Sequence, residues 1–329
     1  MSEHVAIGLN AVITAVTKEV PRFLALRSAG PDQAAPFDAL PFGPFDPLRD
    51  RTLELGLRRW VREKTGIEIG YVEQLYTFGN RNRDPRERRG GPRVISVAYL
   101  TLVREGPPSR TVDAVWRDWY RYFPWEDWRA GRPAVIDSRI APALRRWIRA
   151  ARTRELRIER QERCDIYFGL GGAPWVAERV LDRYELLYEI GLAAEAERDR
   201  RVPQPVTGGR ERPRRASGLG QPMAFDHRRI LATALGRLRG KLKYRPVVFE
   251  LLPETFTLLQ LQRTVEALAG IGLHKQNFRR LVEAGGLVEG TGRMDIRTGG
   301  RPAEIFHFRR DVLRERPAPG VGISGLLYG

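Results

Sequence analysis

The segment from Tyr244 to Phe308 constrains the fold more than any other part of this chain. It has the pattern of a helix, a glycine-rich turn at residues 270–272, a second helix and a hairpin of two alternating strands. Thr257 and Gln260 are spaced as in a capping box, in which the two side chains satisfy backbone N–H groups at a helix start. Elements in this order predict a winged helix-turn-helix, a fold that places its second helix in the major groove of DNA.

The second helix, expected over residues 274–284, carries side chains suited to reading bases. Phe278, Leu281 and Val282 have the spacing of a buried face, which leaves the basic and amide residues outside. Arg can bond guanine through two hydrogen bonds, and Asn or Gln can do the same with adenine, while a basic hairpin tip can contact phosphates or the minor groove. The predicted DNA-contacting residues are Lys275, Gln276, Asn277, Arg279, Arg280, Arg297, Thr298 and Arg301. A three-helix domain whose hairpin contacts protein is the alternative reading.

Charge and composition agree with this prediction without establishing it. A net charge of +17 over 329 residues favours polyanionic partners, namely nucleic acid, nucleotides or an anionic membrane surface. An arginine-rich composition can equally reflect a GC-rich genome. No apolar run approaches the roughly 20 residues of a membrane span, so no membrane partner is expected. A single cysteine, Cys164, excludes an intramolecular disulfide, and we expect a cytoplasmic protein.

The rest of the chain has the pattern of a mixed α/β region followed by a linker. Strands are expected over residues 5–17, 22–26, 67–78 and 93–103, and helices over 52–64, ending at Gly66, and over 174–198, with Pro174 in the first turn. Between 107 and 165 lie five tryptophans and a basic helix that leads into a polar strand. The predicted organisation is a domain over 1–198, a basic Pro-, Gly- and Arg-rich linker over 199–224, a winged helix-turn-helix domain over 225–316 and a flexible tail over 317–329.

Residues 225–309 resemble a known family. The segment FDHRRILATALGRLRGKLKYRPVVFELLPETFTLLQLQ, with the later NFRR and GGRPAEIFHF, is similar to the carboxyl-terminal half of Nudix-related transcriptional regulators of NAD metabolism, above all the alphaproteobacterial NrtR- and NadQ-like type. The resemblance is looser over 1–105 and 175–198, and residues 107–165 read as an insertion. It implies an α/β (α+β) fold in which a Nudix-like sandwich sensor domain precedes the winged helix. It also implies a repressor of NAD synthesis genes that binds an adenine-containing metabolite such as ADP-ribose.

The family motif of catalytic Nudix enzymes is G-x5-E-x7-R-E-U-x-E-E-x-G-U, with U an aliphatic residue. Arg59 and Glu63 fit this motif, but Trp60 and Lys64 stand at its other two clustered acidic positions. Hydrolysis of a pyrophosphate on such a scaffold needs Mg²⁺ held by several carboxylates. The sequence therefore predicts no enzymatic activity, no metal and no catalytic residue. Arg59 and Glu63 could equally be an ordinary ion pair one helical turn apart.

A sensor for an anionic nucleotide needs cations and an aromatic or apolar slot for the base. The predicted ligand-binding residues are Arg27, Phe78, Arg81 and Arg83. Each could instead be an ordinary surface arginine or, for Phe78, a core residue. The expected effector is ADP-ribose, NAD or ATP, and no other cofactor is expected.

Together these patterns predict a ligand-responsive transcriptional regulator, a repressor of NAD biosynthesis genes that binds a palindromic operator as a homodimer. A dimer is expected because one short recognition helix reads few base pairs. The insertion is the candidate for part of the dimer interface, together with its tryptophans, Trp116, Trp119, Trp125, Trp128 and Trp147. Two alternatives stay open, an active Nudix-type pyrophosphohydrolase with a DNA-binding tail and a non-specific nucleic-acid-binding protein.

Overall fold

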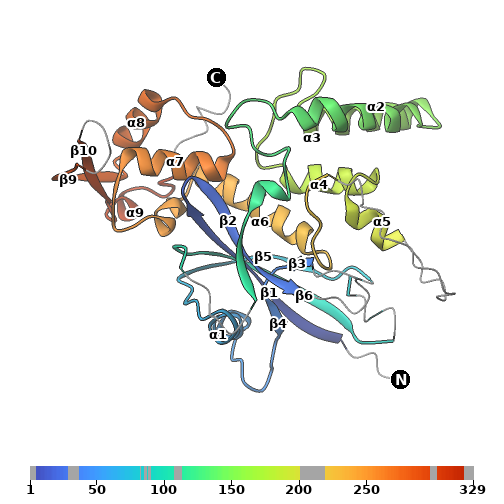
Figure 1. The fold of residues 1–329 in the computed structure, drawn as a ribbon, viewed down its shortest axis with the longest axis horizontal. Helices are drawn as coiled ribbons and strands as arrows, with labels where there is room; N and C mark the ends of the chain where they lie inside the picture. The colour runs from blue at the N-terminus through green and yellow to red at the C-terminus, as the bar shows by residue number, and fades with distance from the viewer. Residues whose placement is uncertain are drawn as a thin grey trace.

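The computed structural model describes residues 5–28, 37–81, 83–84, 87, 90–106, 113–200, 219–296 and 302–321. A twisted sheet lies at the centre of this part of the chain, with one helix on one face and a layer of helices on the other (Figure 1). The winged helix lies at one end of the helical layer, and a helical hairpin projects at the other end. None of the helices described is both long and apolar enough to cross a bilayer.

The central sheet is organised around one long strand that is buried on both faces. Its strands are β1 (Val5–Thr17), β2 (Val20–Ser28), β3 (Phe37–Ala39), β4 (Phe42–Pro44), β5 (Tyr71–Phe78), β6 (Arg93–Leu102) and β7 (Ala114–Asp118). The order is β3-β2-β1-β6-β5, with β4 paired to β1 and β7 paired to β2. β1 and β6 run parallel, whereas the other pairs are antiparallel. The continuous apolar run of β1 follows from this central place, because both of its faces are covered.

One face of the sheet is covered by α1 (Leu53–Thr65). Thr52 begins this helix by accepting a hydrogen bond from the backbone of Leu55, and Gly66 ends it in the left-handed region at φ 70°. Leu57 and Val61 pack against the apolar side chains that β1 presents to this face. The predicted helix and its glycine stop are confirmed.

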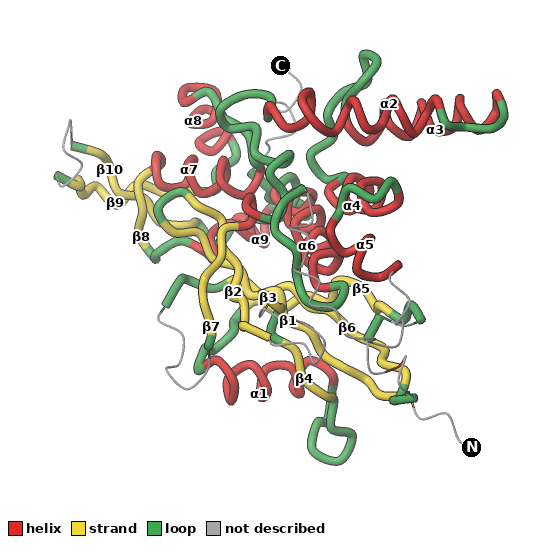
Figure 2. The backbone as a smooth tube through the Cα atoms, turned by 45° about the vertical axis from the view of Figure 1, so that its right-hand side comes forward, coloured by secondary structure: helices red, strands yellow, loops and turns green. Residues whose placement is uncertain are grey.

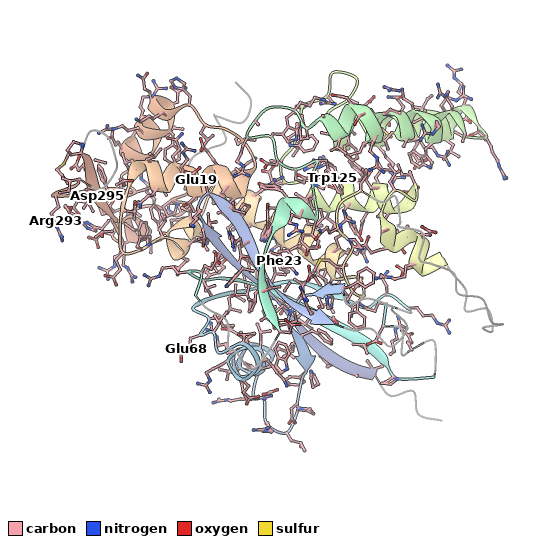
Figure 3. All side chains as sticks on the ribbon, viewed as in Figure 1. Glu19, Phe23, Glu68, Trp125, Arg293 and Asp295 are labelled. Atoms are coloured by element: carbon pink, nitrogen blue, oxygen red, sulfur yellow. The ribbon has the colours of Figure 1, made fainter. Side chains whose placement is uncertain are left out.

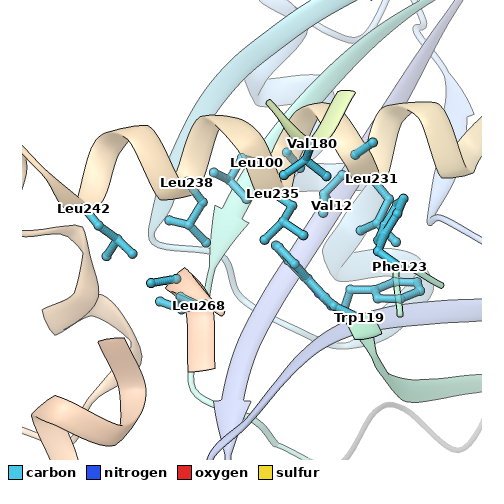
Figure 4. Close-up of a cluster of buried hydrophobic side chains, with 14 of the residues drawn as sticks. Val12, Leu100, Trp119, Phe123, Val180, Leu231, Leu235, Leu238, Leu242 and Leu268 are labelled. Carbon is cyan, nitrogen blue, oxygen red and sulfur yellow. The ribbon is translucent and has the colours of Figure 1, made fainter. Parts of the chain in front are cut away.

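The opposite face is covered by α6 (His227–Leu242), whose leucines recur at helical spacing. Leu231, Leu235 and Leu238 are buried in a cluster that includes Val12 of β1 and Trp119, and Leu268 of the winged helix joins the same cluster (Figure 4). The hydrophobic core is therefore continuous from the sheet to the winged helix. Leu219 and Met223 of the expected linker are buried in it, which corrects that expectation for residues 219–224; residues 201–218 of the linker lie outside the described residues.

Beyond β7, the inserted segment is mainly helical. It contains α2 (Ala141–Arg149) and α3 (Arg154–Phe168), and it is followed by α4 (Val180–Glu189) and α5 (Ala194–Arg200). The expected strand after the basic helix is wrong, because Thr153 caps a second helix there. Pro174 does not begin a helix either, since α4 starts at Val180.

Two tryptophans of the insertion belong to the core of the chain. The side chains of Trp119 and Trp125 are wholly buried within the chain itself. They cannot contact a second subunit, so the expected dimer interface is wrong for these two residues. Trp116, Trp128 and Trp147 are partly buried and pack against the two core clusters.

A buried ionic network ties the insertion to α4 and α6. Arg183 donates two hydrogen bonds to the Glu126 carboxylate, at 2.6 and 2.9 Å, and Arg239 donates a third at 2.5 Å. The three side chains are at most 1% exposed. Arg183 also lies 3.8 Å from the centre of the Trp175 ring, and burial lowers the pKa of Arg183 from its usual value. One carboxylate thus balances two guanidinium groups out of reach of water.

The winged helix consists of α7 (Leu258–Ala269), α8 (Lys275–Ala284) and a small sheet. The sheet has the order β8-β10-β9, from β8 (Thr255–Thr257), β9 (Val288–Asp295) and β10 (Ala303–Phe308), and it is flanked by a 3-10 helix (Val247–Leu251) and α9 (Val312–Glu315). Both hydrogen bonds of the predicted capping box are present. In the tube view this small sheet lies at the left, and the central sheet lies to its right and lower (Figure 2).

The turn between α7 and α8 is fixed against the insertion. Gly270 ends α7 at φ 72°, and a Cβ atom there would lie 2.4 Å from the carbonyl oxygen of Glu126. Its own carbonyl accepts a hydrogen bond of 2.6 Å from the backbone N–H of Trp128. Glycine is therefore required both by the backbone conformation and by the close approach of the inserted segment.

Candidate functional site

The outer face of α8 forms the first candidate site. Phe278 and Val282 hold the helix on the core, with Phe278 1% exposed. The five predicted base-reading residues of this helix all lie on its exposed side: Lys275, Gln276, Asn277, Arg279 and Arg280. The first turn contains no acidic residue, so the positive end of the helix dipole is unopposed there. This surface has the charge and the donor groups that a DNA groove requires.

Two features of this surface go beyond the sequence prediction. Arg279 donates a 2.8 Å hydrogen bond to Glu283 one turn later, which raises the pKa of Arg279, so contact with a base would replace this partner. Arg293 is exposed on β9 and points outward from the wing (Figure 3). The predicted wing-tip residues Arg297, Thr298 and Arg301 lie outside the described residues.

A cavity of about 380 Å³ forms the second candidate site. It opens between β1, β4, the end of α1 and the residues that precede α6. Its walls are mostly apolar and aromatic, with two cations and one carboxylate among them. The lining residues are Ala6, Ile7, Gly8, Asn10, Phe42, Gly43, Pro44, Trp60, Lys64, Arg83, Asp84, Pro92, Val94, Ser96, Phe225 and His227.

Three rings form one wall of this cavity. The ring centres of Phe42, Phe225 and His227 lie 5.1 to 5.4 Å from one another. Phe225 has a φ of 53°, a left-handed conformation that is strained for a bulky residue. Such strain persists only where surrounding contacts impose it. The start of α6 is therefore held against the cavity in a conformation that the isolated chain would avoid.

His227 is the neutral member of this wall. Its Nδ1 accepts a 3.0 Å hydrogen bond from the backbone N–H of Leu40, and its Nε2 lies 3.1 Å from the side-chain amide of Asn10. A neutral ring that accepts at Nδ1 carries its proton at Nε2, so this contact requires the oxygen of the Asn10 amide, not its nitrogen, to face the ring and accept the hydrogen bond. Burial is the main cause that lowers the pKa of His227, to about 3, and the charge of Arg83 adds to it.

Arg83 joins the loop after β5 to the start of α6. Its guanidinium donates to both carboxylate oxygens of Asp226, at 2.9 and 2.5 Å, and also to the hydroxyl of Ser96. The Arg83 side chain is 6% exposed. Lys64, at the end of α1, is the exposed cation of the cavity.

The predicted ligand residues are spread over the structure, which describes all four of them. Arg83 lines the cavity, whereas Arg27 and Arg81 are exposed elsewhere and do not line it. Phe78 is 1% exposed and packs in the core below Arg229, so it has no open ring face for a base. The sequence analysis missed Asn10, Phe42, Phe225 and His227 as lining residues. The position of Asn10 inside the apolar run of β1 is the sequence signal that could have indicated its burial.

The helix that carries the incomplete Nudix motif borders the same cavity. Trp60 and Lys64, which stand at two acidic positions of the motif, both line it. Glu63 instead pairs with Arg59 at 3.1 Å, and Arg59 also binds both oxygens of Asp50 at 2.9 Å. The pKa of Asp50 is lowered, first by a backbone hydrogen bond from Asp46 and then by Arg59. Within the described ranges, no three His, Cys, Asp or Glu side chains gather closely enough to hold a metal ion.

Comparison with known proteins identifies the winged helix. Residues 248–308 match the model of the NrtR DNA-binding winged helix domain. Over 86 residues the chain is 40% identical to a protein of Acinetobacter baylyi described as ADPR responsive transcriptional repressor NtrR. This match covers 26% of the chain and 34% of that relative, so the chain spans about a third of the length of the curated relative.

Solved structures show the same arrangement over nearly the whole chain. Shewanella oneidensis NrtR, in complex with a 27mer DNA, matches with a TM-score of 0.54 at 21% identity, over 94% of this chain and 95% of that chain. A MutT/nudix family protein from Enterococcus faecalis matches with a TM-score of 0.52 at 18% identity, over 94% and 88%. Residues 248–308 therefore match the NrtR-type winged helix domain, and the chain as a whole shares the α/β fold of these solved structures, in which this domain follows a sheet domain of Nudix-like fold.

Proposed function

We propose that this protein is a transcriptional repressor of NAD biosynthesis genes that binds operator DNA through α8 and the β9–β10 wing and senses an adenine nucleotide in the cavity. The observation that supports this proposal most is that α6 links the cavity to the winged helix. Phe225 and His227 line the cavity from the start of α6, and the far end of α6 packs on α7 of the winged helix. A ligand in the cavity thus contacts the same helix that supports the DNA-reading surface.

The chemistry of the cavity suits an adenine nucleotide. The rings of Phe42 and Phe225 offer faces and edges for a base, and Lys64 and Arg83 offer positive charge for phosphate oxygens. We take ADP-ribose as the effector because the Acinetobacter baylyi relative is described as ADPR responsive. NAD and ATP are the other candidates, since they share the adenosine and pyrophosphate groups.

The signal would travel along α6. Its 16 residues from His227 to Leu242 span about 24 Å at about 1.5 Å per residue. The helix is anchored near the cavity by the Arg83–Asp226 pair and near the winged helix by Leu238 and Leu242. A ligand that binds one placement of α6 more tightly than another shifts the population of DNA-binding-competent molecules by that difference in affinity.

We also propose that the Nudix-like domain is not an enzyme. Mg²⁺-dependent hydrolysis needs clustered carboxylates, and the motif helix turns an indole and an ammonium group toward the cavity instead. Glu63 is engaged by Arg59. Release of AMP from ADP-ribose by the pure protein with Mg²⁺, lost in Glu63→Gln, would favour the alternative of an active hydrolase.

A homodimer is part of the proposal. One α8 reads only a few base pairs, and a two-fold pair of these helices matches a palindromic operator. Because Trp119 and Trp125 are buried within the chain, the dimer surface must be formed by other residues. We infer a cytoplasmic location from the proposed role as a DNA-binding regulator.

Fluorescence anisotropy tests the whole proposal. Duplexes from upstream of the NAD biosynthesis genes of the same genome are compared with a scrambled duplex at near-physiological salt, with and without ADP-ribose, NAD and ATP. The proposal predicts preferential binding to the operator duplex, changed by one of the nucleotides. Equal binding to both duplexes, weakening steeply with salt and indifferent to nucleotides, would leave only non-specific nucleic-acid binding.

A further inference from the structure

The α2–α3 hairpin, residues 141–168, is the part of the molecule that the proposed function does not use. It projects from the helical layer at the end opposite the wing, and Figures 1 and 2 place it on the same upper side of the molecule as α8. Its base is firmly held. Leu144 of α2 and Phe168 of α3 are fully buried in the core, and Arg163 pairs with Glu189 of α4 at 2.7 Å.

The two helices of the hairpin are also joined to each other. Arg160 of α3 lies 4.4 Å from the centre of the Trp147 ring and donates a 2.6 Å hydrogen bond to the Trp147 carbonyl. Thr153 caps α3 directly after the turn by accepting from the backbone of Leu156. The tip of the hairpin is therefore carried on a rigid support, which lowers the entropy lost when it binds a partner.

The tip itself carries a cluster of unpaired positive charge. Residues 145–157 contain six arginines and one glutamate, a net charge of +5. All six arginines are exposed: Arg145, Arg146, Arg149, Arg152, Arg154 and Arg157. None of their side chains has an ion pair, a hydrogen bond or a ring contact with another described residue, whereas the side chains of Arg160 and Arg163, nearer the base, have such partners.

Folding stability does not account for these charges. Arg152, Arg154 and Arg157 lie at or near the first turn of α3, where the helix dipole is positive and where a cation is unfavourable. The one acidic residue of the tip, Glu155, satisfies the helix start: backbone and Thr153 hydrogen bonds lower its pKa. The cluster is thus a set of forked donors with no anion supplied by the described protein.

We propose that the tip of the α2–α3 hairpin binds the phosphate backbone of double-stranded DNA beside the operator. Guanidinium groups bind phosphate oxygens through paired, charge-assisted hydrogen bonds, and a rigid tip offers several of them at once. DNA is the polyanion that the winged helix of the same chain brings close. The inference rests on the proposed function in one respect, that α8 positions the protein on the operator.

The test compares two triple variants on two duplexes. Arg149→Gln, Arg152→Gln and Arg157→Gln remove charge from the tip but keep aliphatic side chains on the helices. The matched control is Arg49→Gln, Arg51→Gln and Arg62→Gln, which removes the same charge from exposed residues beside and on α1. Each protein is titrated, over a range of salt concentrations, with a minimal operator duplex and with the same operator extended on both sides.

The wild-type protein is expected to bind the extended duplex more tightly than the minimal one. The tip variant should lose this gain, with an affinity for the extended duplex about tenfold lower and a salt slope reduced by about 2–3, since each phosphate contact contributes about 0.9. Its binding to the minimal duplex should match the wild type. Equal losses in the tip variant and the control, or no loss in either, would overturn the proposal.

Two further measurements show whether the partner of the tip is DNA or a membrane surface, and whether the tip and α8 contribute to DNA binding separately. If the tip variant keeps its DNA affinity but loses binding to phosphatidylserine vesicles, the partner is a membrane surface and the inference is wrong. If Arg279→Ala leaves operator binding unchanged, the proposed function fails, but the difference between tip and control variants on a long duplex still tests the tip on its own.

Discussion

The buried network around Glu126 gives a direct test of how the inserted segment is joined to the rest of the fold. Glu126→Gln keeps the shape of the side chain and removes its charge. The carboxylate accepts three charged hydrogen bonds, at 2.5 to 2.9 Å, from two guanidinium groups that are at most 1% exposed. Removing one partner of a buried ion pair costs about 3–5 kcal/mol, because the remaining charge is left without compensation.

This loss in the free energy of unfolding corresponds to a fall in the melting temperature. Unfolding entropy of about 2.1 cal/mol/K per residue gives about 0.7 kcal/mol/K for 329 residues, so Tm should fall by about 4–7 °C. The matched control is Glu54→Gln, which breaks an exposed pair with Arg58 and should cost under about 0.5 kcal/mol. Differential scanning calorimetry measures both. A Glu126→Gln protein that melts within about 1 °C of the control would refute the claim that this carboxylate is needed to hold the two arginines.

Three further predictions concern the cavity and α8. The ordinary pKa of His is about 6.5, whereas the pKa of His227 in the folded protein is about 3, so the unfolded chain binds the proton more readily. The contribution of His227 to the free energy of unfolding is therefore complete above pH 6.5 and falls as the pH is lowered from there toward 3. When the pH is lowered from 7.5 to 5, the free energy of unfolding in urea should fall by about 2 kcal/mol more for the wild type than for His227→Gln, and equal falls in the two proteins would contradict this. Lys64→Ala should weaken ADP-ribose binding about tenfold in calorimetric titration, as expected for the loss of one charge-assisted phosphate contact, while Arg62→Ala on the same helix, outside the cavity lining, should not. Arg279→Ala should cost about 1–3 kcal/mol of operator affinity and relax sequence preference, whereas a uniform loss over all sequences would mean that it contacts phosphate alone.

The incomplete Nudix motif indicated only some of the residues that line the cavity. The motif marked Trp60 and Lys64 as replacements for acidic residues, and in the structure both line the cavity. It could not indicate that Phe225 and His227 would meet them there, because these residues lie more than 150 positions further along the chain. Their place depends on how α6 packs on the sheet, and on the Arg83–Asp226 pair that holds its start.

Long-range burial also explains the predictions that failed. The aromatic residues between 107 and 165 are too apolar for an ordinary surface, and the sequence alone does not say whether they face a second subunit or the core of the same chain. The structure buries Trp119 and Trp125 within the chain. Phe78 is a similar case, since its position at the end of β5 fixes which face of the sheet it covers.

The sequence by itself determined the local elements: the capping box at Thr257, the glycine stops at Gly66 and Gly270, and the apolar runs of β1 and β6. These depend on interactions within a few residues, namely backbone capping, left-handed glycine conformations and side-chain periodicity. The tertiary structure alone decided which side chains share the cavity, which arginines are balanced by Glu126, and which remain unpaired at the tip of the α2–α3 hairpin. Those outcomes depend on contacts between segments far apart in the chain, and no local spacing encodes them.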